Sequence, residues 1–231
     1  MATLEIEKVD LASFCYLNKE RYPFLLESVN HNENNRYSIL FAFPEEKIVL
    51  RDFSDFIFLN ELENQLEPSN DNSNLPFTGG WFVYLSYELI GQIELTLASK
   101  LHKSNIPIAY AVKIPSAVIT DHKLKKTFII DKDGNQTRVN KILSDIKALE
   151  NIPDKAINGK IKEENKKKFT DGVKSSLDYI VAGDVFQVNL SREWSYSLSS
   201  NQDSAIIYQK LKKANPAPFS ALIQYEDFSI I

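Results

Sequence analysis

A lysine-rich polar stretch divides this chain of 231 residues into two unequal parts. Residues 155–168 contain six lysines and two glutamates, and Pro153 and Gly159 interrupt the apolar pattern there. This composition is typical of a solvated linker running into a helix, and a phosphate-binding surface is the less favoured alternative. We therefore predict a domain over residues 1–155, a linker over 156–165 and a second domain over 166–231.

Short apolar runs bounded by turn residues predict that the first domain is rich in strands. Asp10 precedes apolar residues at helical spacing, which predicts a short helix. Gly79 and Gly80 permit a tight entry into an aromatic strand. The runs at 37–43 and 47–51 are expected to be neighbouring strands of a meander. The other expected elements are strands over 22–28, 108–113, 117–121 and 127–131, a helix over 139–149, and a helix over 54–67 that buries Phe56, Leu59, Leu62 and Leu66.

The sequence of the second part predicts a helix over 169–180 that ends at Gly183. It also predicts a long strand over 185–196 and a helix over 205–214 that is stopped by Pro216. A strand pair over 219–225 and 228–231 follows. The expected fold class is α+β: an antiparallel strand-rich N-terminal domain, then a helix–strand–helix–strand opening of a second domain. Because no stop signal follows the last strand, we expect this second domain to be truncated.

Composition excludes several classes of protein. A net charge of −4 and a pI near 5.5 favour neither nucleic acid nor an anionic membrane as a partner. The single cysteine, Cys15, cannot form an intrachain disulfide and is expected to be a small core residue. No apolar run approaches the ~20 residues of a membrane span, and the acidic N-terminus does not resemble a secretion signal. We expect a cytoplasmic protein.

Local chemistry centres on Glu27 and Ser28, which end an apolar predicted strand. A buried carboxylate needs a partner. A local arginine such as Arg36 is the favoured partner for Glu27, and a cationic ligand group is the alternative. Asp121 and His122 are adjacent on a predicted strand, so they point to opposite faces and are expected to be structural.

Several segments, in order along the chain, resemble the family of aminodeoxychorismate synthase component I and anthranilate synthase component I. Two of them, 180–192 (IVAGDVFQVNLSR) and 213–221 (KANPAPFSA), resemble the start of its chorismate-binding domain. The others resemble its N-terminal domain: 23–28 (PFLLES), 36–39 (RYSI), 76–81 (PFTGGW) with 84–88 (YLSYE), and the pair Asp121 and His122.

This resemblance implies amination of chorismate in a magnesium-dependent reaction, with ammonia from a glutaminase subunit. Trp81, the run 84–88 and Asp121–His122 are more similar to the aminodeoxychorismate side of the family, which belongs to folate synthesis. Anthranilate synthase, in tryptophan synthesis, is the runner-up, and a non-catalytic tryptophan-binding or subunit-docking module is the third reading. The family's magnesium ligands and lysine nucleophile lie beyond the matched segments, so the chain alone is expected to be inactive.

The resemblance also carries over particular residues. Gln187 matches a position where water-using relatives have a catalytic lysine, and glutamine cannot act as that base. Its alternative reading is an inward-facing polar residue on a buried strand. The resemblance also implies that the chain contains the family's tryptophan pocket. The alternative is that the same residues form an ordinary domain interface. The pocket implies ligand-binding roles for nine residues: Glu27, Ser28, Arg36, Tyr37, Ser38, Asn215, Pro216, Ala217 and Phe219.

Overall fold

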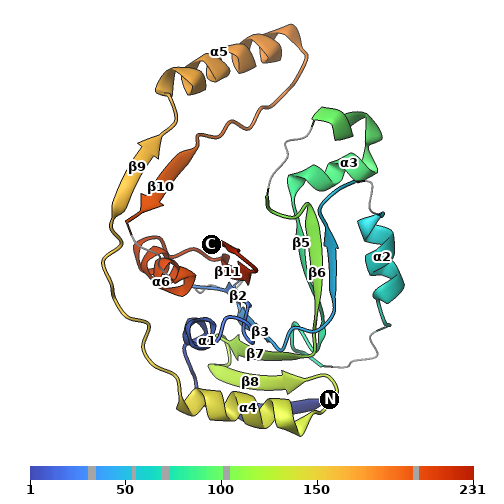
Figure 1. The fold of residues 1–231 in the computed structure, drawn as a ribbon, viewed down its shortest axis with the longest axis vertical. Helices are drawn as coiled ribbons and strands as arrows, with labels where there is room; N and C mark the ends of the chain where they lie inside the picture. Colours follow the sequence, from blue (N-terminus) through green and yellow to red (C-terminus); the bar gives the residue numbers. More distant parts are fainter. Residues whose placement is uncertain (31–34, 54–55, 69–72, 101–104, 200–202) are drawn as a thin grey trace. The chain divides into compact units, whose positions relative to one another are not determined.

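The computed structural model describes residues 1–30, 35–53, 56–68, 73–100, 105–199 and 203–231. They form two compact units, which we call unit 1 (Met1–Asp154 with Ser204–Ile231) and unit 2 (Lys155–Asp203) (Figure 1). This division differs from the predicted boundaries, because residues 204–231 join the first part of the chain. The expected antiparallel, strand-rich α+β fold is confirmed.

Unit 1 is built on an antiparallel seven-stranded sheet. Its strand order is β1 (Ala2–Ile6), β8 (Lys126–Asp131), β7 (Ser116–Asp121), β3 (Tyr37–Ala42), β2 (Phe24–Glu27), β11 (Ser220–Tyr225) and β12 (Phe228–Ile230). The pairing of β11 with β2, in which Ser220 lies opposite Glu27, ties the last part of the chain to the first. Strand β1 was not predicted, and its partner β8 lies far along the chain.

Helices cover one face of this sheet: α1 (Leu11–Leu17), α4 (Gln136–Lys147) and α6 (Ser204–Ala214). Leu25 and Leu40 face these helices, and their strand neighbours Phe24 and Phe41 face the other way. Side chains alternate in this manner because successive Cβ atoms of a strand point to opposite faces. As predicted, Cys15 is buried among the residues between helices and sheet.

A three-stranded antiparallel sheet covers the other face. It consists of β4 (Lys47–Leu50), β6 (Ala109–Ile114) and β5 (Gly80–Leu85), in that order. The rings of Phe24 and Phe82 stack between the sheets with centroids 4.0 Å apart. The predicted meander of 37–43 and 47–51 is therefore wrong. Phe43, with φ at 59°, turns the chain out of the first sheet before β4 begins in the second.

Helix α2 (Phe58–Gln65) packs beside the three-stranded sheet. Its buried residue is Phe58, whereas Leu59 and Leu66 are 41% and 57% exposed. The predicted buried stripe is wrong for these two leucines: Phe58 is buried instead of Leu59, and Leu66 lies beyond the end of the helix at Gln65. Residues 54 and 55, at the start of the predicted helix, lie outside the described residues. The sequence also missed the short helices η1 (Tyr87–Leu89), α3 (Ile90–Ile93) and η2 (Leu95–Lys100).

Unit 2 consists of an antiparallel strand pair, β9 (Gly159–Glu163) and β10 (Trp194–Leu198), and helix α5 (Lys166–Ala182). Asn165 caps the helix through its side chain. Gly183 ends it at φ 82°, and this end was predicted. The predicted strand over 185–196 is wrong up to residue 193, because only Trp194 onward finds a partner strand. That partner, β9, lies in the predicted linker.

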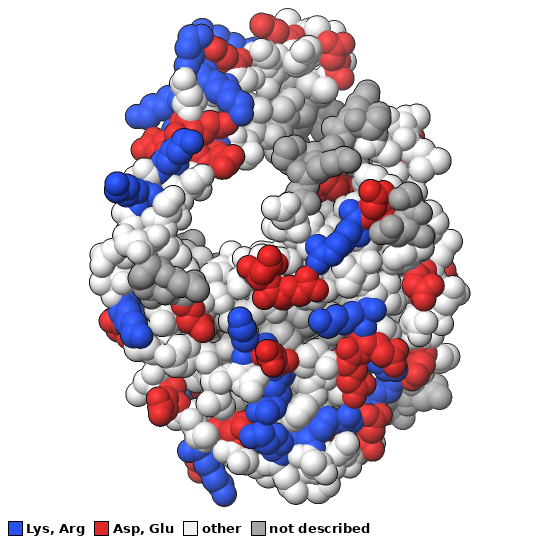
Figure 2. Space-filling model, in the orientation of Figure 1, with Lys and Arg blue, Asp and Glu red and all other residues white. Residues whose placement is uncertain are grey.

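Acidic and basic side chains are interspersed over the face of the molecule shown in Figure 2. None of the helices in the described ranges is long and apolar enough to cross a membrane.

Candidate functional site

The carboxylate of Glu27 is held by helix α6. The Tyr208 hydroxyl donates to Glu27 Oε2 at 2.6 Å, and Lys212 Nζ donates to Oε1 at 2.7 Å. The side chains of Glu27 and Lys212 are 11% and 20% exposed. Burial, followed by the nearby Glu27 charge, raises the pKa of Tyr208 far above its ordinary value, so this hydroxyl remains a neutral donor.

Arg36 is not the partner of Glu27, so that prediction is wrong. Arg36 Nε and Nη2 instead form a forked ion pair with Asp121, whose shortest contact is 2.6 Å from Nη2 to Oδ2. Burial alone would raise the pKa of Asp121. The bonds from Arg36 and from the backbone N–H groups of Lys123 and Leu124 outweigh burial and hold that pKa below its usual value. The register of β3 on β7 places Tyr37 opposite Asp121, which brings Arg36 within reach.

Ser28, Ser38 and His122 form a connected polar group at the ends of β2, β3 and β7. Ser28 N donates to Ser38 Oγ at 3.1 Å, and Ser28 Oγ donates to the carbonyl of Tyr37 at 2.9 Å. Ser38 Oγ lies 2.7 Å from His122 Nε2. Asp121 and His122 thus contact different partners, Arg36 and Ser38. This is consistent with the prediction that both residues are structural.

These side chains border a cavity of about 410 Å³ in unit 1, which we call the Glu27 cavity. Three of the nine predicted ligand-binding residues line it: Glu27, Ser28 and Ser38. The other lining residues are Lys8, Val9, Asp10, Leu11, Val29, Thr120, His122 and Lys212. None of these eight residues was predicted from the sequence to belong to the site. The Asp121–His122 resemblance was the one available signal for His122, whereas no local pattern distinguishes Lys212 from its neighbouring lysines.

Arg36 and Tyr37 do not line the cavity. The Arg36 guanidinium lies over the Tyr37 ring, 4.7 Å from its centroid, and the Tyr37 hydroxyl donates to the carbonyl of Asn74. Asn215, Pro216, Ala217 and Phe219 are also outside the lining. The carbonyl of Ala217 accepts hydrogen bonds from the backbone of Val29 and Asn30, at 3.2 and 3.3 Å, so this segment lies beside the end of β2. Phe219 is 81% exposed.

Gln187 lies in unit 2, in an irregular segment, and its exposed side-chain amide donates to Asn189 Oδ1 at 3.3 Å. The reading of Gln187 as an inward-facing residue of a buried strand is therefore wrong. Within the described ranges, no three His, Cys, Asp or Glu side chains gather as a metal site would require.

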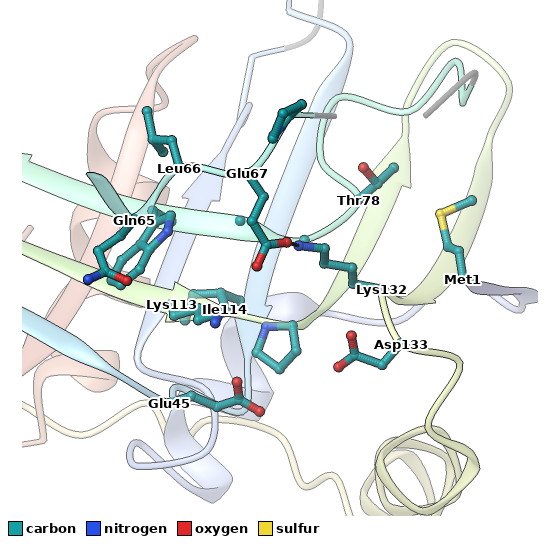
Figure 3. A pocket seen from close by; sticks show the side chains of 15 residues that line it. Met1, Glu45, Gln65, Leu66, Glu67, Thr78, Lys113, Ile114, Lys132 and Asp133 are labelled. Carbon is teal, nitrogen blue, oxygen red and sulfur yellow. Dashed lines mark hydrogen bonds and ion pairs between the residues drawn. The ribbon is translucent and has the colours of Figure 1, made fainter. Parts of the chain in front are cut away.

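A second cavity, of about 530 Å³, lies where the two sheets of unit 1 meet and is built around Gly79 and Gly80. Figure 3 shows Glu67 and Lys132 meeting there, and Lys132 Nζ donates to Glu67 Oε2 at 2.7 Å. Gly79 has φ at 111°, and a Cβ on it would lie 2.6 Å from Lys132 Cβ. Arg138 pairs with Glu45 and Asp133 as well as with the buried Asp131. Each acidic side chain that lines this cavity therefore has a basic partner within the chain.

The fold is that of a known class of synthase subunit. Anthranilate synthase component I from Streptococcus pneumoniae TIGR4 matches with a TM-score of 0.68 at 21% sequence identity. The match covers 89% of this chain and 51% of that chain. At this identity the likeness concerns the fold alone.

Curated relatives agree with this class. Anthranilate synthase component 1 of Lactococcus lactis subsp. lactis is 25% identical, over 92% of this chain and 52% of its own length. Aminodeoxychorismate synthase component 1 of Bacillus subtilis is 29% identical, over 72% of this chain and 37% of its own length. The chain thus spans about half, or less, of the length of these two relatives.

Residues 21–231 match the family described as chorismate binding enzyme. The chain belongs to this family, as the resemblance predicted.

Proposed function

We propose that this chain is the N-terminal portion of an aminodeoxychorismate synthase component I. The intact enzyme would aminate chorismate to 4-amino-4-deoxychorismate, with Mg²⁺ and with ammonia from a glutaminase subunit. The observation that carries this proposal is the family match over residues 21–231. Within that match, Trp81 and the run 84–88 on β5 and after it, together with Asp121–His122, resemble the aminodeoxychorismate side.

Anthranilate synthase component I is the second candidate. The specific observation in its favour is the name of the Lactococcus lactis relative, which matches over a larger share of this chain than the aminodeoxychorismate relative does. Both candidates aminate chorismate, so the product of the reaction separates them.

The test uses the protein encoded by the full reading frame, with chorismate, ammonium and Mg²⁺. We expect 4-amino-4-deoxychorismate, detected as 4-aminobenzoate after treatment with the lyase that cleaves it. Anthranilate, recognised by its fluorescence, would assign the second candidate. Absence of both products would support the third reading, a non-catalytic tryptophan-binding or docking module.

The 231 residues alone are proposed to be inactive, because the family's magnesium ligands and nucleophile do not match positions in this chain. The same assay on the 231-residue chain tests this proposal, and measurable amination of chorismate by that chain would contradict it.

The Glu27 cavity is proposed to be the family's tryptophan pocket. Supporting this are the three lining residues predicted from the resemblance, Glu27, Ser28 and Ser38, and the volume of about 410 Å³, which lies in the usual range for small-molecule sites. The ordinary domain interface remains the alternative, and calorimetric titration with L-tryptophan distinguishes the two.

A further inference from the structure

The strand pair of unit 2, β9 and β10, has one apolar and one polar face. Because side chains alternate along a strand, Trp194, Tyr196 and Leu198 of β10 lie on the same side. Ile161 of β9 is directly opposite Tyr196 and adds to that side. The other side carries two serines and two lysines, paired across the strands: Ser195 with Lys162 and Ser197 with Lys160.

The apolar face of this strand pair is exposed. The exposed fractions are 52% for Trp194, 47% for Tyr196, 38% for Leu198 and 61% for Ile161. The Tyr196 ring lies against Gly159, where an added Cβ would be 2.6 Å from Tyr196 Cε1, and its hydroxyl donates to the carbonyl of Ile157 at 3.2 Å. This ring is therefore held in place with half of its surface free. Contiguous apolar surface of this kind marks an interaction site.

Helix α5 also presents an apolar stripe to solvent. Val173, Leu177 and Ile180 recur at helical spacing and so lie along one side of the helix, and all three are exposed. None of the residues of α5 is buried. An amphipathic helix gains most of its stability from the packing of its apolar face, and an isolated pair of strands is marginally stable in water. Unit 2 therefore requires a further surface that covers these side chains.

We propose that the apolar faces of the β9–β10 pair and of α5 form the docking surface for the polypeptide that follows residue 231 in the full-length protein. The length of the relatives supports this occupant, because they are about twice as long as the part that matches this chain. The contacting surface of that polypeptide is apolar, since aliphatic and aromatic groups face it here. This inference rests on the proposed identity of the chain as the N-terminal portion of a longer enzyme, and it names residues through which the two portions meet.

Hydrogen exchange followed by mass spectrometry tests the docking surface. It compares the 231-residue chain with the protein encoded by the full reading frame. Backbone amides in a covered element open less often, so those of β9, β10 and α5 should exchange about tenfold more slowly in the full-length protein. Peptides from β3 and β7, which lie inside the main sheet of unit 1, are the internal reference and should exchange alike in both proteins. This comparison needs no variant, so it does not depend on the folding of an altered protein.

Substitutions at neighbouring positions of β10 separate the two faces. Tyr196→Glu places a charge on the apolar face and should return the exchange of β9, β10 and α5 in the full-length protein toward that of the 231-residue chain. Ser197→Glu is the matched control, because it places the same charge on the polar face opposite Lys160 and should leave exchange unchanged. Ile161→Glu repeats the test from the partner strand. Circular dichroism of the three variants of the 231-residue chain checks that secondary structure is retained.

Equal exchange of β9, β10 and α5 in the two unaltered proteins would overturn the inference, and so would equal effects of Tyr196→Glu and Ser197→Glu. Sedimentation of the 231-residue chain detects the competing occupant. A dimer that Tyr196→Glu dissociates would assign this surface to a second copy of the chain and would also overturn the inference. Exchange is measured without chorismate, and the proposed enzyme function is tested by the product formed from chorismate. A failure of one proposal is therefore distinguished from a failure of the other.

Discussion

The buried Tyr22 hydroxyl donates a hydrogen bond to Asp145 Oδ2 at 2.7 Å. This bond joins the segment just before β2 to helix α4. The same carboxylate oxygen accepts from Arg21 Nη1 at 2.8 Å, and its other oxygen accepts from Lys141. The helix is thereby fixed to the sheet by polar contacts in addition to its apolar face.

Removal of the Tyr22 hydroxyl should destabilise unit 1. Tyr22→Phe leaves the buried Asp145 without one donor, which should cost about 1–3 kcal/mol of unfolding free energy. Urea unfolding followed by circular dichroism measures this. Tyr87→Phe is the control, because Tyr87 is 79% exposed and its substitution should leave the midpoint unchanged. Equal midpoints for the two variants would contradict the role assigned to the buried bond.

Acid should destabilise the protein through the carboxylates of Asp121, Asp131 and Asp145. Burial acts to raise the pKa of each, but hydrogen bonds and nearby cations outweigh it and leave all three pKa values lowered. A lowered folded-state pKa means that the stabilisation is complete above the unfolded value, about 4, and is lost as the pH falls through the folded value. Unfolding free energies measured between neutral pH and about pH 2 should show this loss, and a flat profile would exclude it.

Asp131 should contribute most clearly to that loss, because its side chain is fully buried and accepts bonds from Ser116 at 2.6 Å and Arg138 Nε at 2.7 Å. Asp131→Asn should cost about 3 kcal/mol at neutral pH by leaving Arg138 without its main partner. It should also reduce the slope of stability against pH in the acid range. A variant as pH-sensitive as the original chain would show that other groups are responsible.

Substitution of Gly79 should strain the entry to β5. With φ at 111° and Lys132 Cβ 2.6 Å from the position of an added Cβ, Gly79→Ala should destabilise unit 1 by about 1–3 kcal/mol. Gly172 offers the matched comparison, because it lies within α5 and an added Cβ there meets Leu190 at an ordinary 3.9 Å. Gly172→Ala should leave the helix intact or raise its stability by about 1 kcal/mol. Thermal unfolding of both variants tests this contrast.

Loss of the Ser28 hydroxyl should weaken a ligand in the Glu27 cavity. Ser28 Oγ donates to the Tyr37 carbonyl and lines the cavity, so Ser28→Ala removes an acceptor from its wall. We expect about a threefold to tenfold rise in the dissociation constant of L-tryptophan, measured by calorimetric titration. Ser176→Ala, on α5 of unit 2, serves as the control. Unchanged affinity in Ser28→Ala would remove this residue from the site.

Local patterns in the sequence predicted the elements whose signals are also local. Gly183 ends α5, and Pro216 follows the end of α6 at Ala214, as predicted. The errors concern long-range pairing. Strands β3 and β4 are close in sequence but enter different sheets, and residues 185–193 have strand composition without a partner strand.

The candidate site shows the same contrast between local and long-range signals. Glu27, Ser28 and Ser38 were predicted because they belong to short motifs with a recognisable order. Lys212 was missed, since its contact with Glu27 depends on how α6 packs beside the paired strands β2 and β11. No periodicity within α6 specifies which of its lysines reaches that carboxylate.

The pairing of β2 with β11 also has a consequence for synthesis on the ribosome. Strand β2 is synthesised about 190 residues before its neighbour β11, since Glu27 pairs with Ser220. At bacterial to eukaryotic elongation rates, that interval lasts roughly 10–40 s. Throughout this interval, one edge of β2 has no partner strand. The nascent chain is therefore most exposed to misassembly and to chaperone capture before residue 220 emerges.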